Sequence, residues 1–176
     1  MFGFLIINKP IGPTSHDIVA RVRRLLPRKT KVGHAGTLDP FADGVVLVGI
    51  GHATRLIDDI HQFPKTYRTT VTLGARSDSG DPTGEITPTA GEIIAPSAAA
   101  VESALEPFRG VIDQVPPAHS AIHIDGKRAY ELARAGETVD MPTRTVTIHE
   151  LMLLRHEGLE VELEITCSTG TYIRSI

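Results

Sequence analysis

Apolar side chains fall into short blocks along the chain, and their spacing predicts where strands lie. Residues 4–7 (Phe-Leu-Ile-Ile) and 45–48 (Val-Val-Leu-Val) are brief apolar runs bounded by turn residues, which is typical of buried strands. Residues 65–73 alternate between two faces, with Tyr67 on the more apolar one. Two further strands that pair around a tight turn are predicted at residues 144–154 and 159–167.

Helices are predicted in four places. The first follows Thr14, which forms a weak capping box with Asp17, and Pro27 ends it. A second runs from the N-cap Ser97 to Leu105. The other helical stretches are residues 54–60 and residues 127–135, closed by Gly136, while residues 74–84 form a loop and residues 114–120 are extended. Because strands and helices lack a strict βαβ rhythm, we expect an α+β fold with a mixed, largely antiparallel sheet flanked by helices.

Composition is that of a packed globular chain. Of the 176 residues, 41% are apolar and 22% are charged, which is close to the average of globular domains and argues against disorder. Aromatic residues make up only 5% and tryptophan is absent, so aliphatic side chains must fill the core. The formal net charge of −3 argues against a uniformly basic coat for nucleic acid.

A local basic run modifies that picture. No acidic residue lies between Ile18 and Leu38, whereas this stretch contains Arg21, Arg23, Arg24, Arg28, Lys29 and Lys31. Such a run can neutralise RNA phosphates. A solvated helix face followed by a basic loop would produce the same pattern, and on the run alone this second interpretation is favoured.

The only cysteine, Cys167, excludes an internal disulfide framework and a cysteine-rich zinc site. It falls on the apolar side of the alternating stretch 159–167, so we expect it to pack inward. No apolar run approaches the roughly 18 residues that a membrane helix needs. The N-terminus has neither a basic n-region nor a small-residue cleavage site, so a cytoplasmic location is expected.

Residues 33–40 (Gly-His-Ala-Gly-Thr-Leu-Asp-Pro) are the first candidate for chemistry. The two glycines allow tight turns and close approach of a ligand, and Pro40 biases Asp39 away from the helical region. A carboxylate on such a rigid loop beside His34 could be a nucleophile or a base. Asp-Pro is also a common turn, and composition alone favours the turn.

Two other segments are weaker candidates. Residues 49–54 follow a strand as a dinucleotide-binding loop does, but Thr54 replaces the third glycine and a tight strand-to-helix connection is favoured. Near the end of the chain, Arg174 could pair with a carboxylate or a phosphate, or be a surface arginine. Among the eight histidines, only His119 and His123 are four residues apart, and they do not lie on a predicted helix, so no metal is expected.

Taken in order, several stretches resemble the TruB family of tRNA pseudouridine synthases. They are residues 8–15 with their Lys-Pro pair, 33–40 with the continuation to 54, the tyrosine strand at 65–68, the loop 77–84, and residues 116–121, 126–131 and 167–174. Each motif is modest, but the ordered set covers essentially the whole chain. The resemblance implies the pseudouridine synthase fold, with residues 1–176 as a catalytic domain that is truncated at its C-terminus and lacks a PUA-like domain. The chain as given is therefore expected to be poorly active or inactive.

The reaction that the resemblance implies is isomerisation of the T-loop uridine of tRNA (position 55) to pseudouridine. The N1–C1′ glycosidic bond is replaced by a C5–C1′ bond, and no cofactor or metal is implied because nothing is oxidised and no atoms are lost. The base must be flipped into a pocket. The implied partner is the T stem-loop of tRNA, with no obligate protein partner, no membrane and a monomeric state.

The resemblance also implies residue roles. Asp39 would start bond cleavage by attacking C1′, adding to C6 or abstracting the C2′ proton, and the sequence leaves these routes open. Arg174 would pair with Asp39 and keep it ionised, while Tyr67 would stack on the uracil and is a candidate for removing the C5 proton. His34 would take part in base extrusion, with Tyr172 also binding substrate, and Lys9 and Pro10 would support the loop. The RNA-backbone contacts would be Arg21, Arg24, Arg28, Lys29 and Lys31.

Three alternatives stay open. A non-catalytic RNA-binding module on the same scaffold would keep its affinity for a T-loop stem after Asp39→Asn. A nucleotide-binding enzyme that uses residues 49–54 would be protected by a nucleotide. A related synthase with a different RNA target is the nearest rival, although the compact loop favours the stand-alone bacterial type over relatives that act within guide-RNA particles. Asp78 and Asp81 are interpreted as ordinary loop residues.

Overall fold

The computed structural model describes residues 1–120, 122–124 and 126–176. They form two compact units, Met1–Phe63 (unit 1) and Pro64–Ile176 (unit 2). Every strand pairing among the described residues is antiparallel, and helices lie beside the sheets, which confirms the α+β expectation. None of the helices in these ranges is both long and apolar enough to cross a membrane.

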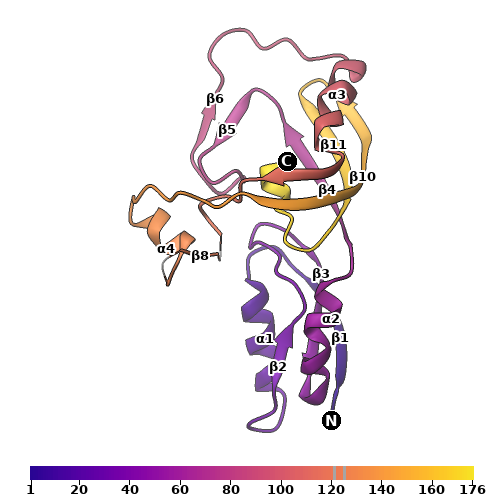
Figure 1. The fold of residues 1–176 in the computed structure, drawn as a ribbon, viewed down its shortest axis with the longest axis vertical. Helices are drawn as coiled ribbons and strands as arrows, with labels where there is room; N and C mark the ends of the chain where they lie inside the picture. The colour runs from indigo at the N-terminus through magenta and orange to yellow at the C-terminus, as the bar shows by residue number, and fades with distance from the viewer. Residues whose placement is uncertain (121, 125) are drawn as a thin grey trace. The chain divides into compact units, whose positions relative to one another are not determined.

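Unit 1 contains a three-stranded sheet in the order β1-β3-β2 (Figure 1). Its strands are β1 (Gly3–Lys9), β2 (Val32–His34) and β3 (Gly44–Ile50). The strands predicted at residues 4–7 and 45–48 are confirmed as β1 and β3. The prediction missed β2, because Val32 is the only large apolar residue in this three-residue strand.

Helix α1 (Ser15–Arg24) packs on this sheet and begins with the predicted capping box. Thr14 Oγ1 accepts from the Asp17 N–H at 3.0 Å, and the Asp17 carboxylate accepts from the Thr14 N–H at 2.9 Å. Its buried face contributes to a core of Ile18, Val19, Val22, Val32, Val46, Val48 and Ile50. The helix ends at Arg24, before Pro27, and Leu25, which follows it, is 86% exposed.

The 3-10 helix η1 (Gly51–Leu56) and helix α2 (Ile57–His61) follow β3, close to the helical turns predicted at residues 54–60. Gly33 and Gly49 lie opposite each other in the β2–β3 ladder. A Cβ on either glycine would stand 3.1 or 3.3 Å from Ile57 Cδ1. Gly49 therefore has a packing role, as a tight strand-to-helix connection requires.

Unit 2 is built on a four-stranded sheet in the order β4-β11-β10-β7. Its strands are β4 (Lys65–Thr72), β7 (Gly110–Gln114), β10 (Arg144–Glu157) and β11 (Glu160–Cys167). Three were predicted, including the β10–β11 hairpin, whereas β7 was not, because only Val111 and Ile112 are apolar in it. Cys167 is wholly buried, which confirms the inward-facing prediction.

One face of this sheet is covered by α3 (Ala98–Leu105), which is followed by the 3-10 helix η2 (Glu106–Phe108). Val101 and Leu105 of α3 share a core with Ile148, Leu151, Leu163 and Ile165 of the sheet. The Ser97 hydroxyl accepts from the Ala100 N–H at 3.2 Å, so the predicted N-cap is confirmed. Residues 74–84 are not entirely loop, because β5 (Ala75–Ser77) pairs with β6 (Ile86–Pro88).

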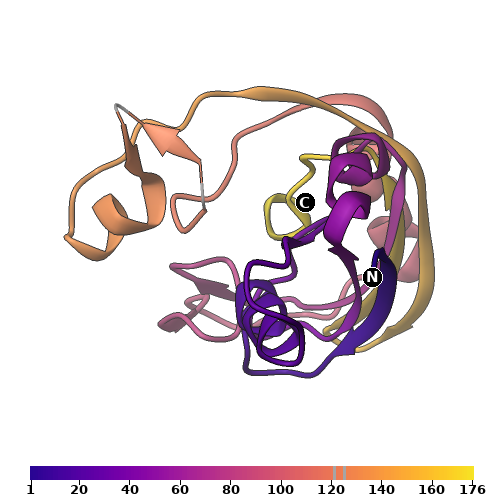
Figure 2. The ribbon, with the colours of Figure 1, turned by 90° about the horizontal axis from the view of Figure 1, so that it is seen from below.

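The described residues between 115 and 143, which we call the arm, extend away from the sheet of unit 2 (Figures 1 and 2). The arm contains β8 (His123–Ile124), β9 (Lys127–Arg128) and α4 (Ala129–Arg134), with a small core of Ile122, Ala129 and Met141. The helix predicted at 127–135 therefore starts two residues late, because residues 127 and 128 pair with β8. Ala121 of the motif at 116–121 lies outside the described residues.

Candidate functional site

Asp39 lies in unit 1 on an irregular loop whose main chain is anchored on both sides. On one side the Leu38 N–H donates to Ser15 Oγ at 2.9 Å, and the Ser15 hydroxyl, itself 1% exposed, lies 3.3 Å from the Leu38 carbonyl oxygen. On the other side the Gly12 N–H donates to the Pro40 carbonyl oxygen at 2.8 Å. Asp39 is therefore the middle residue of a three-residue segment whose two ends are both tied to residues 12–15.

Lys9 and Pro10 contribute to this anchoring from the other side of the turn. The Lys9 side chain is wholly buried, and its Nζ donates to the carbonyl oxygens of Pro10 and Pro13 at 3.0 Å each. A buried ammonium group requires such acceptors. These carbonyls flank Gly12, which binds Pro40, so the geometry supports the expected role of Lys9 and Pro10 beneath the loop.

His34 ends β2, five residues before Asp39, and is half-buried. Its Nδ1 is buried and has no hydrogen-bond partner within the part of the chain that the structure describes. Burial lowers the pKa of His34 and outweighs a hydrogen bond with the Gly36 main chain that acts to raise it, while the nearby His16 and His61 also lower it, so the neutral ring predominates at pH 7. A neutral, half-buried ring can insert among apolar or stacked groups at little electrostatic cost.

The six basic residues between positions 21 and 31 divide into two groups. Arg23, Lys29 and Lys31 line an open hollow of about 510 Å³ together with Thr54. Arg21, Arg24 and Arg28 do not line it. Arg23 also donates to the Val32 carbonyl oxygen at 3.2 Å. None of these six side chains forms a salt bridge with another described residue. The sequence could not show that Arg23 converges with Lys29 and Lys31, because a linear run of charge does not reveal which side chains lie together.

Lys29 occupies an unusual position in this group. Its φ of 70° lies in the left-handed region, where glycine or asparagine is usual. The turn is closed behind it by Thr30, whose N–H and hydroxyl both donate to the Pro27 carbonyl oxygen, at 3.1 and 2.7 Å. A long cationic side chain at such a position suggests a role for its charge.

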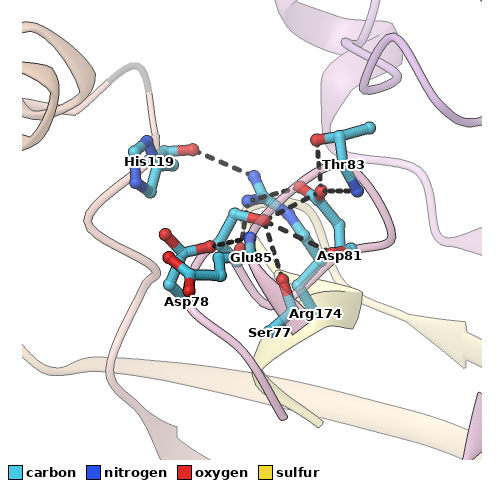
Figure 3. Close-up of polar contacts among 8 residues, drawn as sticks. Ser77, Asp78, Asp81, Thr83, Glu85, His119 and Arg174 are labelled. Atoms are coloured by element: carbon cyan, nitrogen blue, oxygen red, sulfur yellow. Dashed lines mark hydrogen bonds and ion pairs between the residues drawn. The ribbon is translucent and has the colours of Figure 1, made fainter. Parts of the chain in front are cut away.

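Arg174 lies in unit 2 within the 3-10 turn η3 (Ile173–Ser175), which follows β11. Its Nη1 donates to the Ser79 carbonyl oxygen at 3.0 Å and lies 3.4 Å from Asp81 Oδ2. Its Nη2 donates to the His119 carbonyl oxygen at 3.0 Å (Figure 3). The side chains of Arg174 and Asp81 are only 9% and 8% exposed. Arg174 is therefore a buried, clamped guanidinium.

Asp81 is more than the ordinary loop residue that we expected. Its Oδ1 accepts from the Ser79 hydroxyl and the Thr83 N–H at 2.9 Å each, and from the Thr83 hydroxyl at 2.5 Å. Burial acts to raise the pKa of Asp81, but these hydrogen bonds and the Arg174 charge outweigh it, so the pKa is lowered. Alternating hydroxyl residues on either side of the carboxylate were the signal in the sequence. Asp78, in contrast, accepts the Glu85 N–H at 2.8 Å and shapes the loop, as expected.

Tyr67 and Tyr172 are also in unit 2. Tyr67 on β4 is paired with Ile165 and is partly buried against the main core. Tyr172 packs against the small core of the arm, and its main chain is bound by the Gln114 side chain. The expected ion pair of Arg174 with Asp39 would join one unit to the other, and it stays a prediction.

The chain is similar along its whole length to known RNA-modifying proteins. Residues 23–173 match the model of a family described as TruB family pseudouridylate synthase, N-terminal domain. The protein called tRNA pseudouridine synthase B in Bacillus licheniformis is 44% identical over an alignment of 179 positions, which covers 99% of this chain and 58% of that protein. The proteins of the same name in Synechococcus sp. (strain WH7803) and Synechocystis sp. are 48% and 47% identical, over 99% and 100% of this chain and 58% and 60% of theirs. The chain thus spans less than two thirds of the length of these relatives.

Solved structures share the fold. One of them is described as an H/ACA RNP bound to a substrate RNA containing 2′-deoxyuridine. A chain in it matches with a TM-score of 0.67 and 26% identity, and the match covers 99% of this chain and 40% of that one. A chain of a Cbf5-Nop10-Gar1 complex has a TM-score of 0.68 and 29% identity, with coverages of 99% and 42%.

Proposed function

The chain belongs to the TruB family of pseudouridylate synthases, and from this premise we propose that it converts the T-loop uridine of tRNA, at position 55, into pseudouridine. The observation that carries the proposal is the 44–48% identity to proteins called tRNA pseudouridine synthase B over 99–100% of the chain. We assign residues 1–176 to one catalytic domain that acts on the T stem-loop as a cytoplasmic monomer.

The reaction is an isomerisation in which every atom is retained. The bond between N1 of uracil and C1′ of ribose breaks, the base turns within the site, and C5 forms a new bond to C1′. The proton on C5 is then lost, and N1 regains one. Asp39 starts the cleavage, by attack on C1′, by addition to C6 or by removal of the C2′ proton, and Tyr67 stacks on the base and serves the later proton removal.

The anchoring of the Asp39 loop supports this role. A carboxylate that acts in a near-attack geometry must be held close to its reactive position before substrate arrives. The hydrogen bonds of Leu38 and Pro40 to Ser15 and Gly12 fix the main chain on both sides of Asp39. In the proposed site, Arg174 pairs with Asp39 and keeps it ionised, which requires a guanidinium already fixed in direction, as its buried contacts provide.

The need to flip the target base out of the T loop suggests roles for His34 and Tyr172. The target uracil must leave the stack of the T loop, and a side chain that fills the vacated space lowers the cost of its departure. The neutral, half-buried His34 suits that place, because inserting a charged ring among stacked bases would require its desolvation. Tyr172, on the turn that carries Arg174, contributes to substrate binding.

The test compares Asp39→Asn and Asp39→Ala with the parent, all as full-length proteins. A T-loop RNA stem-loop is incubated with each protein, and pseudouridine is scored by mass spectrometry. We expect a loss of about 10³-fold or more in both variants with retained RNA binding, because no other group supplies the carboxylate. The matched control is Asp43→Asn, which removes an exposed carboxylate of the same loop and should leave the rate unchanged. Full activity of Asp39→Ala would refute the proposal.

Contacts to the RNA backbone are proposed for the basic residues of unit 1, with the hollow as their centre. Arg23, Lys29 and Lys31 converge there, so one phosphate group could meet several cations. We compare the triple change of these residues to glutamine with the same triple change of Arg21, Arg24 and Arg28, which alters the net charge equally. The hollow variant should bind RNA about 10-fold more weakly with a reduced salt dependence. If both triple variants weakened RNA binding equally, the effect would be one of diffuse charge. The proposal that the hollow is the centre of RNA contact would then be refuted.

A further inference from the structure

The side chain of Gln114 makes a two-point contact with the main chain of Tyr172. The Tyr172 N–H donates to Gln114 Oε1 at 2.8 Å, and Gln114 Nε2 donates to the Tyr172 carbonyl oxygen at 3.0 Å. Gln114 is 5% exposed, so water has little access to this pair. A side-chain amide presents a donor and an acceptor side by side, which lets it bind both polar groups of one residue as a neighbouring strand would.

Gln114 is itself well fixed. It is the last residue of β7, an outer strand of the sheet, and its main chain is in register with Arg144 of β10. The amide therefore extends from a rigid strand to a turn that has only three residues of regular structure, Ile173–Ser175. A short 3-10 turn has weak hydrogen-bond geometry of its own, so its orientation depends on such outside contacts.

The residues that follow Gln114 hold the same turn from further points. The Val115 carbonyl oxygen accepts from the Ser175 hydroxyl at 2.9 Å, and the His119 carbonyl oxygen accepts from Arg174 Nη2 at 3.0 Å. Three of the four residues 172–175, namely Tyr172, Arg174 and Ser175, are thus bound by the segment 114–119. Of these contacts only the Gln114 amide pair depends on the identity of a residue in that segment, because the others use carbonyl groups of the main chain.

We propose that Gln114 is a positioning residue of the pseudouridine synthase site, whose amide fixes the main chain of Tyr172 and thereby aims Arg174 and the Tyr172 ring. The inference rests on the proposed function. Gln114 is not a catalytic residue, since it acts through the turn. A shift of about 1 Å in a group that must be aligned with the reacting atoms can reduce a rate about 10²-fold, so loss of the amide pair should appear in kcat.

The first test is Gln114→Met, which keeps the approximate volume and removes both hydrogen-bonding groups. We expect kcat per folded molecule to fall about 10- to 100-fold while KM for a T-loop stem-loop changes less than about 3-fold. Hydrogen exchange of the peptide that contains Tyr172 should become faster, because its N–H loses its acceptor. The matched control is Asp113→Asn, on the preceding residue, whose exposed carboxylate accepts from the Thr145 hydroxyl across the strands at 2.8 Å.

The second test, Gln114→Glu, keeps the size of the side chain, and its protonated form restores both hydrogen bonds. An ionised carboxylate can accept from the Tyr172 N–H but repels the Tyr172 carbonyl oxygen, whereas a protonated carboxyl group supplies donor and acceptor again. The ratio of the variant's kcat to the parent's should therefore rise as the pH falls through the pKa of the introduced carboxyl group. A residue that serves stability alone would not produce such a profile in the folded enzyme.

The outcomes separate the inference from its premise. All variants are compared as full-length proteins, and a full-length parent that forms no pseudouridine refutes the proposed function and the inference together. An active parent, with kcat per folded molecule unchanged in Gln114→Met and a flat pH ratio for Gln114→Glu, refutes the inference alone. A fall in kcat with pH-dependent recovery in the glutamate variant and normal rates for Asp113→Asn supports it.

Discussion

The loop that carries Asp39 and the turn that carries Arg174 are held in different ways. Around Asp39 the contacts grip the main chain, through the Ser15 hydroxyl and the Gly12 N–H. At Arg174 they grip the side chain itself, through the Ser79 and His119 carbonyl oxygens and the Asp81 carboxylate. The contacts around Asp39 fix the main chain from which its side chain extends. The contacts of Arg174 fix the guanidinium group at the tip of its side chain.

This difference matches the chemistry proposed for the two residues. A carboxylate that attacks or deprotonates a sugar must start from a fixed point of the main chain, and the anchored loop provides that point. A guanidinium that orients another charge acts best when its planar fork does not move. The two regions should therefore respond differently to substitution, and each experiment below tests that contrast.

Among the changes that test this contrast, the largest effect is expected for Arg174→Lys, which keeps the charge but not the planar guanidinium. A single ammonium group cannot reach the Ser79 and His119 carbonyl oxygens from two separate segments as the guanidinium does at 3.0 Å each. We expect kcat for pseudouridine formation to fall about 10²- to 10³-fold, measured on a T-loop stem-loop.

Its control is Arg155→Lys, at an exposed arginine paired with Glu157 on the surface of the same unit. This change should leave kcat as it is. Near-parental activity of Arg174→Lys would mean that charge alone suffices, and the contrast between the two regions would fail.

Asp81→Asn should have the next largest effect, about 10- to 100-fold on kcat, because the fork loses its charged partner. It also carries a pH signature. The pKa of Asp81 is lowered below the usual 3.8, so its ionised form stabilises the fold fully above about pH 4, and this contribution is lost as the pH falls through the lowered value. Urea unfolding at pH 7 and pH 3 should show the parent more stable than the variant at pH 7, with the difference reduced at pH 3. A difference that grows towards pH 3 would contradict this assignment.

Ser15→Ala tests the main-chain arrangement. The hydroxyl satisfies the Leu38 N–H at 2.9 Å, and its removal leaves that group unpaired beside Asp39. We expect a loss of about 1–3 kcal/mol in the free energy of unfolding and a fall of about 10-fold in kcat, with KM little changed. Chemical denaturation and steady-state kinetics measure the two effects, and loss of stability with unchanged kcat would show that the loop does not need this anchor.

The same contrast explains which parts could be predicted from sequence. The Asp39 loop can be recognised from the local sequence, because its glycines, Pro40 and the carboxylate lie within eight residues. The strands around it follow the apolar pattern. The clamp on Arg174 comes from Ser79 and Asp81, 95 and 93 residues away, and from His119, 55 residues away. A linear pattern contains no signal for contacts at such separations.

Short elements were missed for a related reason. Strands β2 and β5 have three residues each, too few for a period of two to be recognised, and pairing with a neighbouring strand determines their conformation. The family resemblance identified Arg174 as a site residue but not the residues that hold it in place. Asp81 was therefore interpreted as a loop residue and Gln114 as part of an extended segment. These residues could be identified only once the partners of the turn were known.

The smallest effect is expected for Ser97→Ala, which makes the contrast quantitative because it is chemically the same change as Ser15→Ala. Both serines stand at the start of a helix, but the Ser97 hydroxyl caps its own helix by accepting the Ala100 N–H at 3.2 Å, whereas the Ser15 hydroxyl binds a distant loop. Loss of an N-cap costs about 1 kcal/mol, or about 2–4 °C in Tm for a chain of this size. Since α3 packs on the sheet core and carries none of the proposed site residues, kcat should not change. If kcat fell in both alanine variants in proportion to their loss of stability, a general loss of stability would explain the effect at Ser15. The anchoring of the Asp39 loop would then not be needed to explain it.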